Sequence, residues 1–129
     1  MARIRLGVVE DHERTRANLL TLLSEYSDRL DVVAGFPDAP TFMRSEVKES
    51  LDVVLVDLGL PGIGGAELIR SITVQHPKLR AIALTVFNDA ENVLDALASG
   101  ARGFLLKDEP VEALLRAIDD VVTDKIPLS

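Results

Sequence analysis

The chain has 129 residues, 47% of them hydrophobic and 27% charged, with a net charge of −7 at pH 7 and no cysteine. This length suits a single domain, and the composition argues against a disordered chain and against a membrane-spanning protein. The acidic balance opposes non-specific attraction to nucleic acid, and the lack of cysteine excludes a disulfide, a thiolate metal site and a cysteine nucleophile.

Five short apolar runs alternate with five amphipathic stretches, which is the pattern of a parallel sheet covered by helices on both faces. The predicted strands are 4–9, 30–36, 53–56, 79–84 and 104–106. Three of these runs consist almost entirely of hydrophobic residues, as in strands buried on both faces. We therefore predict an α/β fold with five parallel strands.

Apolar residues recur at helical spacing within 19–26, 68–72, 93–97 and 111–122. The last stretch is the clearest helix, because its apolar residues form one stripe and Pro110 stands where a first helical turn tolerates proline. The weakest predicted helix is 38–50, which has few apolar positions and has Pro37 and Pro40 near its start. The apolar residues at 93–97 are either wholly core or partly an exposed patch.

The unusual polar residues each stand at the end of a predicted strand. Glu10 and Asp11 follow the first strand, Asp57 the third, Thr85 the fourth and Lys107 the fifth. The carboxyl ends of parallel strands share one edge of the sheet, and ligands bind there where the strand order reverses. In the flavodoxin-like order 2-1-3-4-5 this point lies between strands one and three, so Asp11 and Asp57 are predicted to face each other.

Carboxylates gathered in one crevice repel each other unless a cation is present. Magnesium or manganese prefers oxygen ligands, so we predict a divalent metal held directly by Asp11 and Asp57 and through water by Glu10. Lys107 and the hydroxyl of Thr85 can meet phosphate oxygens. Asp57 is then the candidate nucleophile of a phosphoryl transfer that forms an aspartyl-phosphate. The sequence has no Walker-type loop, so ATP is not expected as the direct donor.

Four segments, in this order and spacing, resemble the receiver domain of two-component response regulators over essentially the whole chain. They are Val-Val-Glu-Asp-His at 8–12, the run 56–62 around Asp57, Ala-Leu-Thr at 83–85, and Gly-Phe-Leu-Leu-Lys-Asp at 103–108. The resemblance implies a CheY-like version of the flavodoxin-like fold, with residues 1–123 as the receiver domain. It also implies that a sensor histidine kinase phosphorylates Asp57.

The resemblance further implies roles for individual residues. Asp11, Asp57 and the backbone carbonyl of Gly59 match the residues that hold magnesium in the family. Thr85 and Lys107 match the residues that grip the phosphoryl group. Thr85 is also expected to act in the conformational switch.

The chain departs from the family pattern at three places. Glu10 stands where the family often has Asp, which is a common variant. Phe104 stands where the switch aromatic is often Tyr, so it has no hydroxyl to fix its position, and it either switches or only packs. Lys107 is followed by two acidic residues rather than directly by Pro, so the cis Lys-Pro bond of some relatives is absent.

The segments around Thr85 and after Gly103 look most like receivers of the LuxR/NarL type, which continue into a helix-turn-helix DNA-binding domain. The resemblance therefore implies that 124–129 begin a linker to an output domain not present in this chain. The expected partners are a sensor histidine kinase, a second copy of the chain after phosphorylation, and DNA only through the output domain. No membrane partner is expected, and the N-terminus lacks a secretory pattern, so the expected location is cytoplasmic.

Other interpretations stay open. A strand-ending aspartate such as Asp57 is more often a turn residue, and Asp11 can cap a helix. A phosphohydrolase commonly has a second Asp where this chain has Gly59, so turnover of external substrates is not expected. A flavin carrier would meet repulsion from the acidic residues. A stand-alone or phosphorylation-independent receiver, acting by protein contact, is the remaining alternative.

Overall fold

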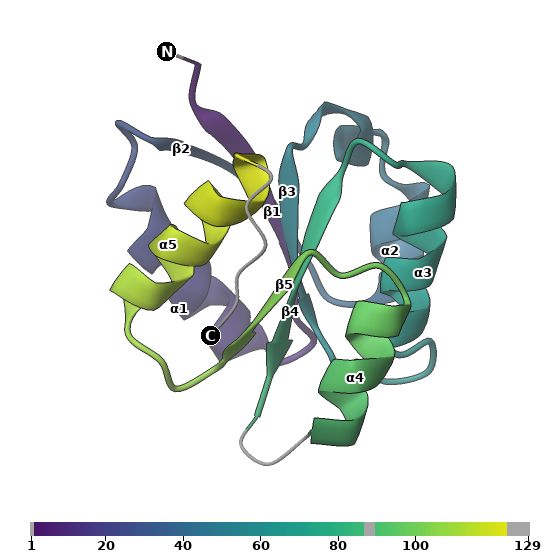
Figure 1. The fold of residues 1–129 in the computed structure, drawn as a ribbon. Helices are drawn as coiled ribbons and strands as arrows, with labels where there is room; N and C mark the ends of the chain where they lie inside the picture. The colour runs from purple at the N-terminus through teal and green to yellow at the C-terminus, as the bar shows by residue number, and fades with distance from the viewer. Residues whose placement is uncertain (1, 87–89, 124–129) are drawn as a thin grey trace.

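The five predicted strands form one parallel sheet in the order β2-β1-β3-β4-β5, as the sequence predicts (Figure 1). The computed structural model describes residues 2–86 and 90–123, so the linker expected at 124–129 lies outside the described residues. The strands are β1 (Ile4–Val9), β2 (Leu30–Phe36), β3 (Val53–Asp57), β4 (Arg80–Thr85) and β5 (Gly103–Leu106).

Helices cover both faces of the sheet, with α1 and α5 on one side and α2, α3 and α4 on the other (Figure 1). The helices are α1 (Glu13–Ser24), α2 (Ala39–Arg44), α3 (Gly65–Gln75), α4 (Ala90–Ala98) and α5 (Val111–Val122), and a 3-10 helix, η1 (Glu46–Ser50), follows α2. Among the described residues, no helix combines the length and apolar character needed to cross a membrane.

The segment 38–50 is not one helix, which corrects the sequence prediction. Asp38 begins α2 by accepting a hydrogen bond from the backbone N–H of Thr41 at 2.8 Å. At Ser45 the backbone is extended, and the serine hydroxyl accepts a hydrogen bond from the N–H of Val47 at 3.2 Å. Ser45 therefore ends α2 and begins η1, because its side chain offers the N–H of Val47 a partner outside a continuous helix.

Buried hydrophobic residues lie on both faces of the sheet, which explains the continuous apolar runs. In β3, Val54 and Val56 belong to the core beneath α2, α3 and α4, whereas Val53 and Leu55 belong to the core beneath α1 and α5. Alternate residues of a strand point to opposite faces. A central strand with helices on each side therefore needs hydrophobic residues at successive positions.

Helix α4 is only partly covered by the rest of the domain. Val93 packs against the core, but Leu94 and Leu97 are 68% and 40% exposed. The apolar residues at 93–97 are therefore core on one side of the helix and exposed on the other.

Candidate functional site

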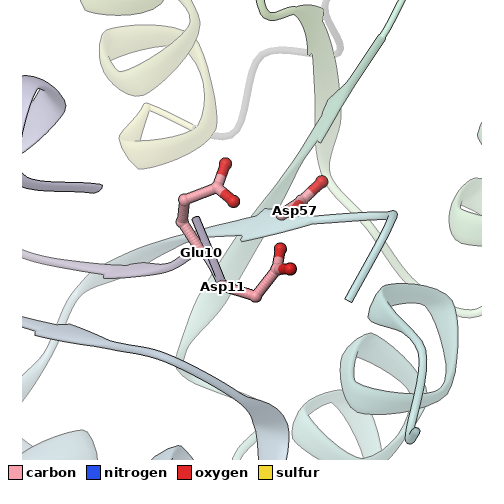
Figure 2. A group of neighbouring side chains, drawn as sticks. All are labelled: Glu10, Asp11 and Asp57. Atoms are coloured by element: carbon pink, nitrogen blue, oxygen red, sulfur yellow. The ribbon is translucent and has the colours of Figure 1, made fainter. Parts of the chain in front are cut away.

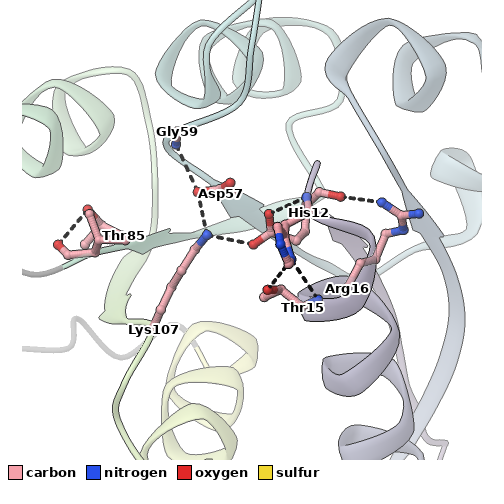
Figure 3. A network of polar contacts seen from close by, with 9 residues as sticks. His12, Thr15, Arg16, Asp57, Gly59, Thr85 and Lys107 are labelled. Carbon is pink, nitrogen blue, oxygen red and sulfur yellow. Dashed lines mark hydrogen bonds and ion pairs between the residues drawn. The ribbon is translucent and has the colours of Figure 1, made fainter.

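The polar residues at the strand ends meet at the carboxyl edge of the sheet (Figures 2 and 3). Glu10 and Asp11 directly follow β1, Asp57 is the last residue of β3, Thr85 is the last residue of β4, and Lys107 directly follows β5. Strands β1 and β3 pair along most of their length. The acidic residues that follow or end these two strands therefore lie where the strand order reverses.

Three carboxylates, from Glu10, Asp11 and Asp57, form an acidic cluster at this edge (Figure 2). One oxygen from each residue lies within 4.8 Å of the others. Glu10 and Asp57 are buried, whereas Asp11 is exposed. Carboxylate oxygens are the donors that magnesium and manganese prefer, and these ions usually keep several waters. A donor set that is buried on one side and open to solvent at Asp11 fits such an ion.

Lys107 reaches the acidic cluster from the end of β5 (Figure 3). Its Nζ lies 2.7 Å from Glu10 Oε1 and 3.0 Å from Asp57 Oδ1. Partial burial lowers the pKa of Lys107, but its hydrogen bonds and ion pairs with Glu10 and Asp57 outweigh this, so the pKa lies above the usual lysine value. The lysine therefore remains positively charged and offsets part of the negative charge of the cluster.

The Asp57 carboxylate is held through one of its two oxygens. Oδ1 accepts a hydrogen bond from the backbone N–H of Gly59 at 2.9 Å and also contacts Lys107. Within the described ranges, no hydrogen-bond donor is found for the second oxygen, Oδ2. The carboxylate is thus oriented by the protein while one oxygen stays available to a ligand.

Helix α3 begins directly against the backbone of Asp57. A Cβ atom on Gly65 would lie 2.3 Å from the Asp57 carbonyl oxygen and 2.6 Å from the Cα of Leu58. Only glycine fits this position, because both neighbouring atoms belong to the backbone. The close approach at Gly65 is therefore to the backbone of the chain itself.

Glu10 makes contacts that the sequence did not reveal. Besides the ion pair of Oε1 with Lys107, its Oε2 accepts a hydrogen bond from the backbone N–H of His12 at 3.0 Å. His12 is the N-cap of α1, and its ring Nδ1 accepts a hydrogen bond from the N–H of Thr15 at 3.3 Å. The alternative in which Asp11 caps this helix is therefore wrong.

Arg16 supports the acidic cluster, although it was not among the candidate residues. Its guanidinium donates a hydrogen bond to the carbonyl oxygen of Glu10 at 2.7 Å. This carbonyl belongs to the peptide bond that joins Glu10 to Asp11, so Arg16 restrains the backbone between the two acids. The sequence feature that could have indicated this role is a basic residue in the first turns of the helix that follows the acidic pair.

Thr85 and Phe104 lie beside the cluster rather than in it. Thr85 is buried, its hydroxyl donates to the carbonyl of Val86 at 3.3 Å, and Figure 3 shows it apart from the Asp57 and Lys107 pair. Its backbone carbonyl accepts a hydrogen bond from the N–H of Lys107 at 2.8 Å. Phe104, in β5, is 36% exposed. The ring is thus only partly covered in this structure.

Comparisons with known families and proteins agree with the arrangement of the site. The model of the response regulator receiver domain matches residues 6–119. The chain is 35% identical over 118 residues to the DNA-binding transcriptional activator DevR/DosR of Mycobacterium tuberculosis, covering 92% of this chain and 54% of that protein. It is 28% identical over 116 residues to the transcriptional regulatory protein DegU of Brevibacillus brevis, covering 90% of this chain and 49% of that protein. The chain thus spans about half the length of these regulators.

Solved structures show the same fold. A LuxR-family two-component response regulator from Aurantimonas sp. SI85-9A1 has a TM-score of 0.88 at 29% identity, covering 99% of this chain and 91% of that chain. The response regulator ChrA of a heme-sensing two-component system has a TM-score of 0.83 at 30% identity. The match covers 100% of this chain and 61% of that chain. The expected fold and the resemblance to LuxR/NarL-type regulators are confirmed. The chain belongs to the family of response regulator receiver domains.

Proposed function

We propose that Asp57 accepts a phosphoryl group from a sensor histidine kinase, with Mg²⁺ or Mn²⁺ bound in the acidic cluster, and that this charge switches the contacts of the domain. The observation that supports this most directly is the placement of Asp57 between two further carboxylates and Lys107. A cation held by these carboxylates, together with Lys107 beside Asp57, would suit a phosphoryl group, whose oxygens carry negative charge.

In the transfer, a carboxylate oxygen of Asp57 attacks phosphorus and forms an O–P bond. The P–N bond to the kinase histidine breaks, and its electron pair stays on the imidazole nitrogen. Asp11, Asp57 and the backbone carbonyl of Gly59 would hold the cation, with Glu10 beside them. When bound, the cation supplies neutralising charge to the phosphoryl oxygens.

Two residues then respond to the phosphorylated aspartate. The phosphoryl group adds roughly one negative charge and several acceptor oxygens. Lys107 pairs with these oxygens, and the hydroxyl of Thr85 moves toward them. We infer that Phe104 turns inward in response and that the surface of α4, β5 and α5 changes. Leu94 and Leu97 already expose apolar area there, which suits dimerisation with a second copy.

The relatives support a DNA-binding output for the switch. Because the chain spans only about half of DevR/DosR, which is a DNA-binding activator, we infer that residues 124–129 lead to a DNA-binding output domain. DNA is then contacted through that domain alone, and the protein acts in the cytoplasm. Turnover of external substrates is not expected, because Gly59 stands where a hydrolase of this kind commonly places a second Asp.

Intact mass spectrometry after incubation with acetyl phosphate tests the proposal. The wild-type chain should gain one phosphoryl group in the presence of Mg²⁺, and Asp57→Asn should gain none. Asp11→Asn should need at least about tenfold more Mg²⁺ for the same gain, because a metal ligand is weakened. Asp108→Asn is the matched control, since this exposed acid has no side-chain partner among the described residues.

Two outcomes would overturn the proposal. No mass gain in the folded wild-type chain would favour a receiver that acts by protein contact without phosphorylation. An equal gain in Asp57→Asn would mean that another residue accepts the phosphoryl group.

A further inference from the structure

We propose that Glu109 is a positioning residue for Lys107, and that its side chain holds the turn after β5 in the shape that directs the lysine toward Asp57. The inference rests on the proposed phosphorylation of Asp57 and adds a residue to that same site. Neither the spacing of the motifs nor the resemblance to receivers indicated a role for Glu109.

Two hydrogen bonds between the same two residues close this turn. The backbone N–H of Glu109 donates to the carbonyl of Leu106 at 3.1 Å. In the other direction, the N–H of Leu106 donates to Oε2 of Glu109 at 2.9 Å. Lys107 lies inside the closed turn, and its own N–H donates to the carbonyl of Thr85 at 2.8 Å. The backbone of Lys107 is thus held by the sheet on one side and by the turn on the other.

The hydrogen bond from Leu106 is one that the sheet itself does not provide. Strand β5 is at the edge of the sheet, with β4 as its neighbour on one side only. Successive N–H groups along a strand point in opposite directions in the plane of the sheet, and that of Lys107 points to β4. The N–H of Leu106 therefore points to the open edge, where the Glu109 carboxylate accepts a charge-assisted hydrogen bond.

A role for Glu109 in capping α5 does not explain this contact. Pro110 is the N-cap of that helix, and the helix start has no side-chain cap hydrogen bond. The Glu109 carboxylate instead reaches back to β5. The contact thus serves the turn that contains Lys107.

Little else restrains the turn. A cavity of about 280 Å³ lies between α1 and α5, and its lining includes Leu106, Lys107 and Glu109, so packing on this side of the turn is incomplete. Lys107 is followed by Asp108 rather than by proline, so no ring restricts the backbone there. A lysine side chain is long and flexible, and the direction in which it reaches therefore depends on how firmly its backbone is held.

Phosphorylation rates measured with acetyl phosphate at saturating Mg²⁺ test the role of Glu109. Glu109→Ala should lower the maximal rate about three- to tenfold, the size expected for the loss of one solvent-exposed hydrogen bond. Its Mg²⁺ affinity should stay within about twofold of wild type, because Lys107 is not a metal ligand. Glu109→Gln keeps an oxygen acceptor of the same length and should retain most of the rate, whereas Glu109→Asp is too short and should be slow.

Two comparisons separate this role from a general structural one. Asp108→Ala removes the neighbouring acid and should phosphorylate at the wild-type rate. In a Lys107→Ala background, Glu109→Ala should cause no further loss of rate, because the residue acts through the lysine. A merely structural role would produce the same loss in both backgrounds.

The outcomes distinguish the two proposals. A wild-type chain that gains no phosphoryl group overturns the proposed function itself. A wild-type chain that is phosphorylated, together with folded Glu109→Ala at an unchanged rate, overturns only the role of Glu109. If Glu109→Ala does not fold, Glu109→Gln and Glu109→Asp at equal rates overturn it in the same way.

Discussion

Lys107 is the residue on which the charge balance of the site depends. It pairs with Glu10 and Asp57, which are only 1% and 4% exposed, while 26% of its own side chain is exposed. Buried carboxylates that lose their positive partner are costly, because little water remains to solvate them. The lysine thus contributes to the stability of the domain as well as to the proposed chemistry.

Lys107→Met should therefore lower the free energy of unfolding by about 1–2 kcal/mol without Mg²⁺, because two buried carboxylates lose their partner. Added Mg²⁺ should narrow this difference, since a cation bound by the folded state replaces the lost charge. Urea denaturation measures both effects. Lys78→Met is the matched control, because Lys78 is an exposed lysine outside the site. Equal losses in the two variants would contradict the assignment.

The stabilisation by Lys107 should depend on pH in the alkaline range. The pKa of Lys107 in the folded state lies above its usual value, so the folded state binds the proton more tightly than the unfolded state. Its contribution is complete below the unfolded pKa of about 10.4 and is lost as the pH rises through the higher folded pKa. The difference in unfolding free energy between wild type and Lys107→Met should be constant from about pH 7 to 9 and shrink above about pH 10.4. A difference that grows with pH would contradict this.

At the scale of elements, the start of α3 shows how closely a helix can approach the site. Gly65 leaves no room for a side chain against the backbone of Asp57, whereas a Cβ on Gly64 would have no neighbour within 4 Å. The two adjacent glycines therefore have different roles. Gly65 permits close packing of helix and strand, and Gly64 provides the helix N-cap.

Gly65→Ala should destabilise the domain by about 1–3 kcal/mol, because the new methyl group forces the start of α3 away from β3. It should also slow phosphorylation, since Asp57 is the residue that is displaced. Gly64→Ala should cost only about 0.5 kcal/mol, the usual size of a change at an N-cap. Thermal or urea unfolding of the two variants measures both losses of stability. Similar losses would show that the close contact between Gly65 and the Asp57 backbone does not determine the stability of the domain.

At the scale of the whole molecule, one sheet separates two hydrophobic cores. Ile69 of α3 lies in one core and Ile118 of α5 in the other, and both are fully buried. Because the central strands supply residues to both cores, neither side can unfold while the other keeps its sheet. The domain should therefore unfold as one cooperative unit.

Ile69→Val and Ile118→Val should each lower the free energy of unfolding by about 0.5–1.5 kcal/mol. The double variant should show the sum, because the two sites share no partner. Far-UV circular dichroism and the fluorescence of Tyr26, the only tyrosine, should report coincident transitions in all three variants. Separate transitions would show that the two sides unfold independently.

The sequence by itself determined the class of fold and the edge at which the polar residues meet, and its resemblance to receiver domains implied the strand order. These features depend on local patterns: apolar runs without a polar position predict strands buried on both faces, and residues at their carboxyl ends share one edge. The positions of Asp57 and Lys107 at strand ends could therefore be predicted from the sequence. The prediction of one helix over 38–50 was wrong, because Ser45 divides this segment into two short helices.

Only the tertiary structure decided which polar groups are partners. Lys107 and Glu10 are 97 positions apart and meet at 2.7 Å, and a contact of this kind depends on how helices and strands pack to within fractions of an ångström. The same is true of the close approach at Gly65. The hydrogen bond from the N–H of Leu106 to Glu109 is local in sequence. This N–H needs a side-chain acceptor only because β5 lies at the edge of the sheet. Sequence periodicity specifies which face a residue occupies, whereas distances between side chains follow from the packing of the whole domain.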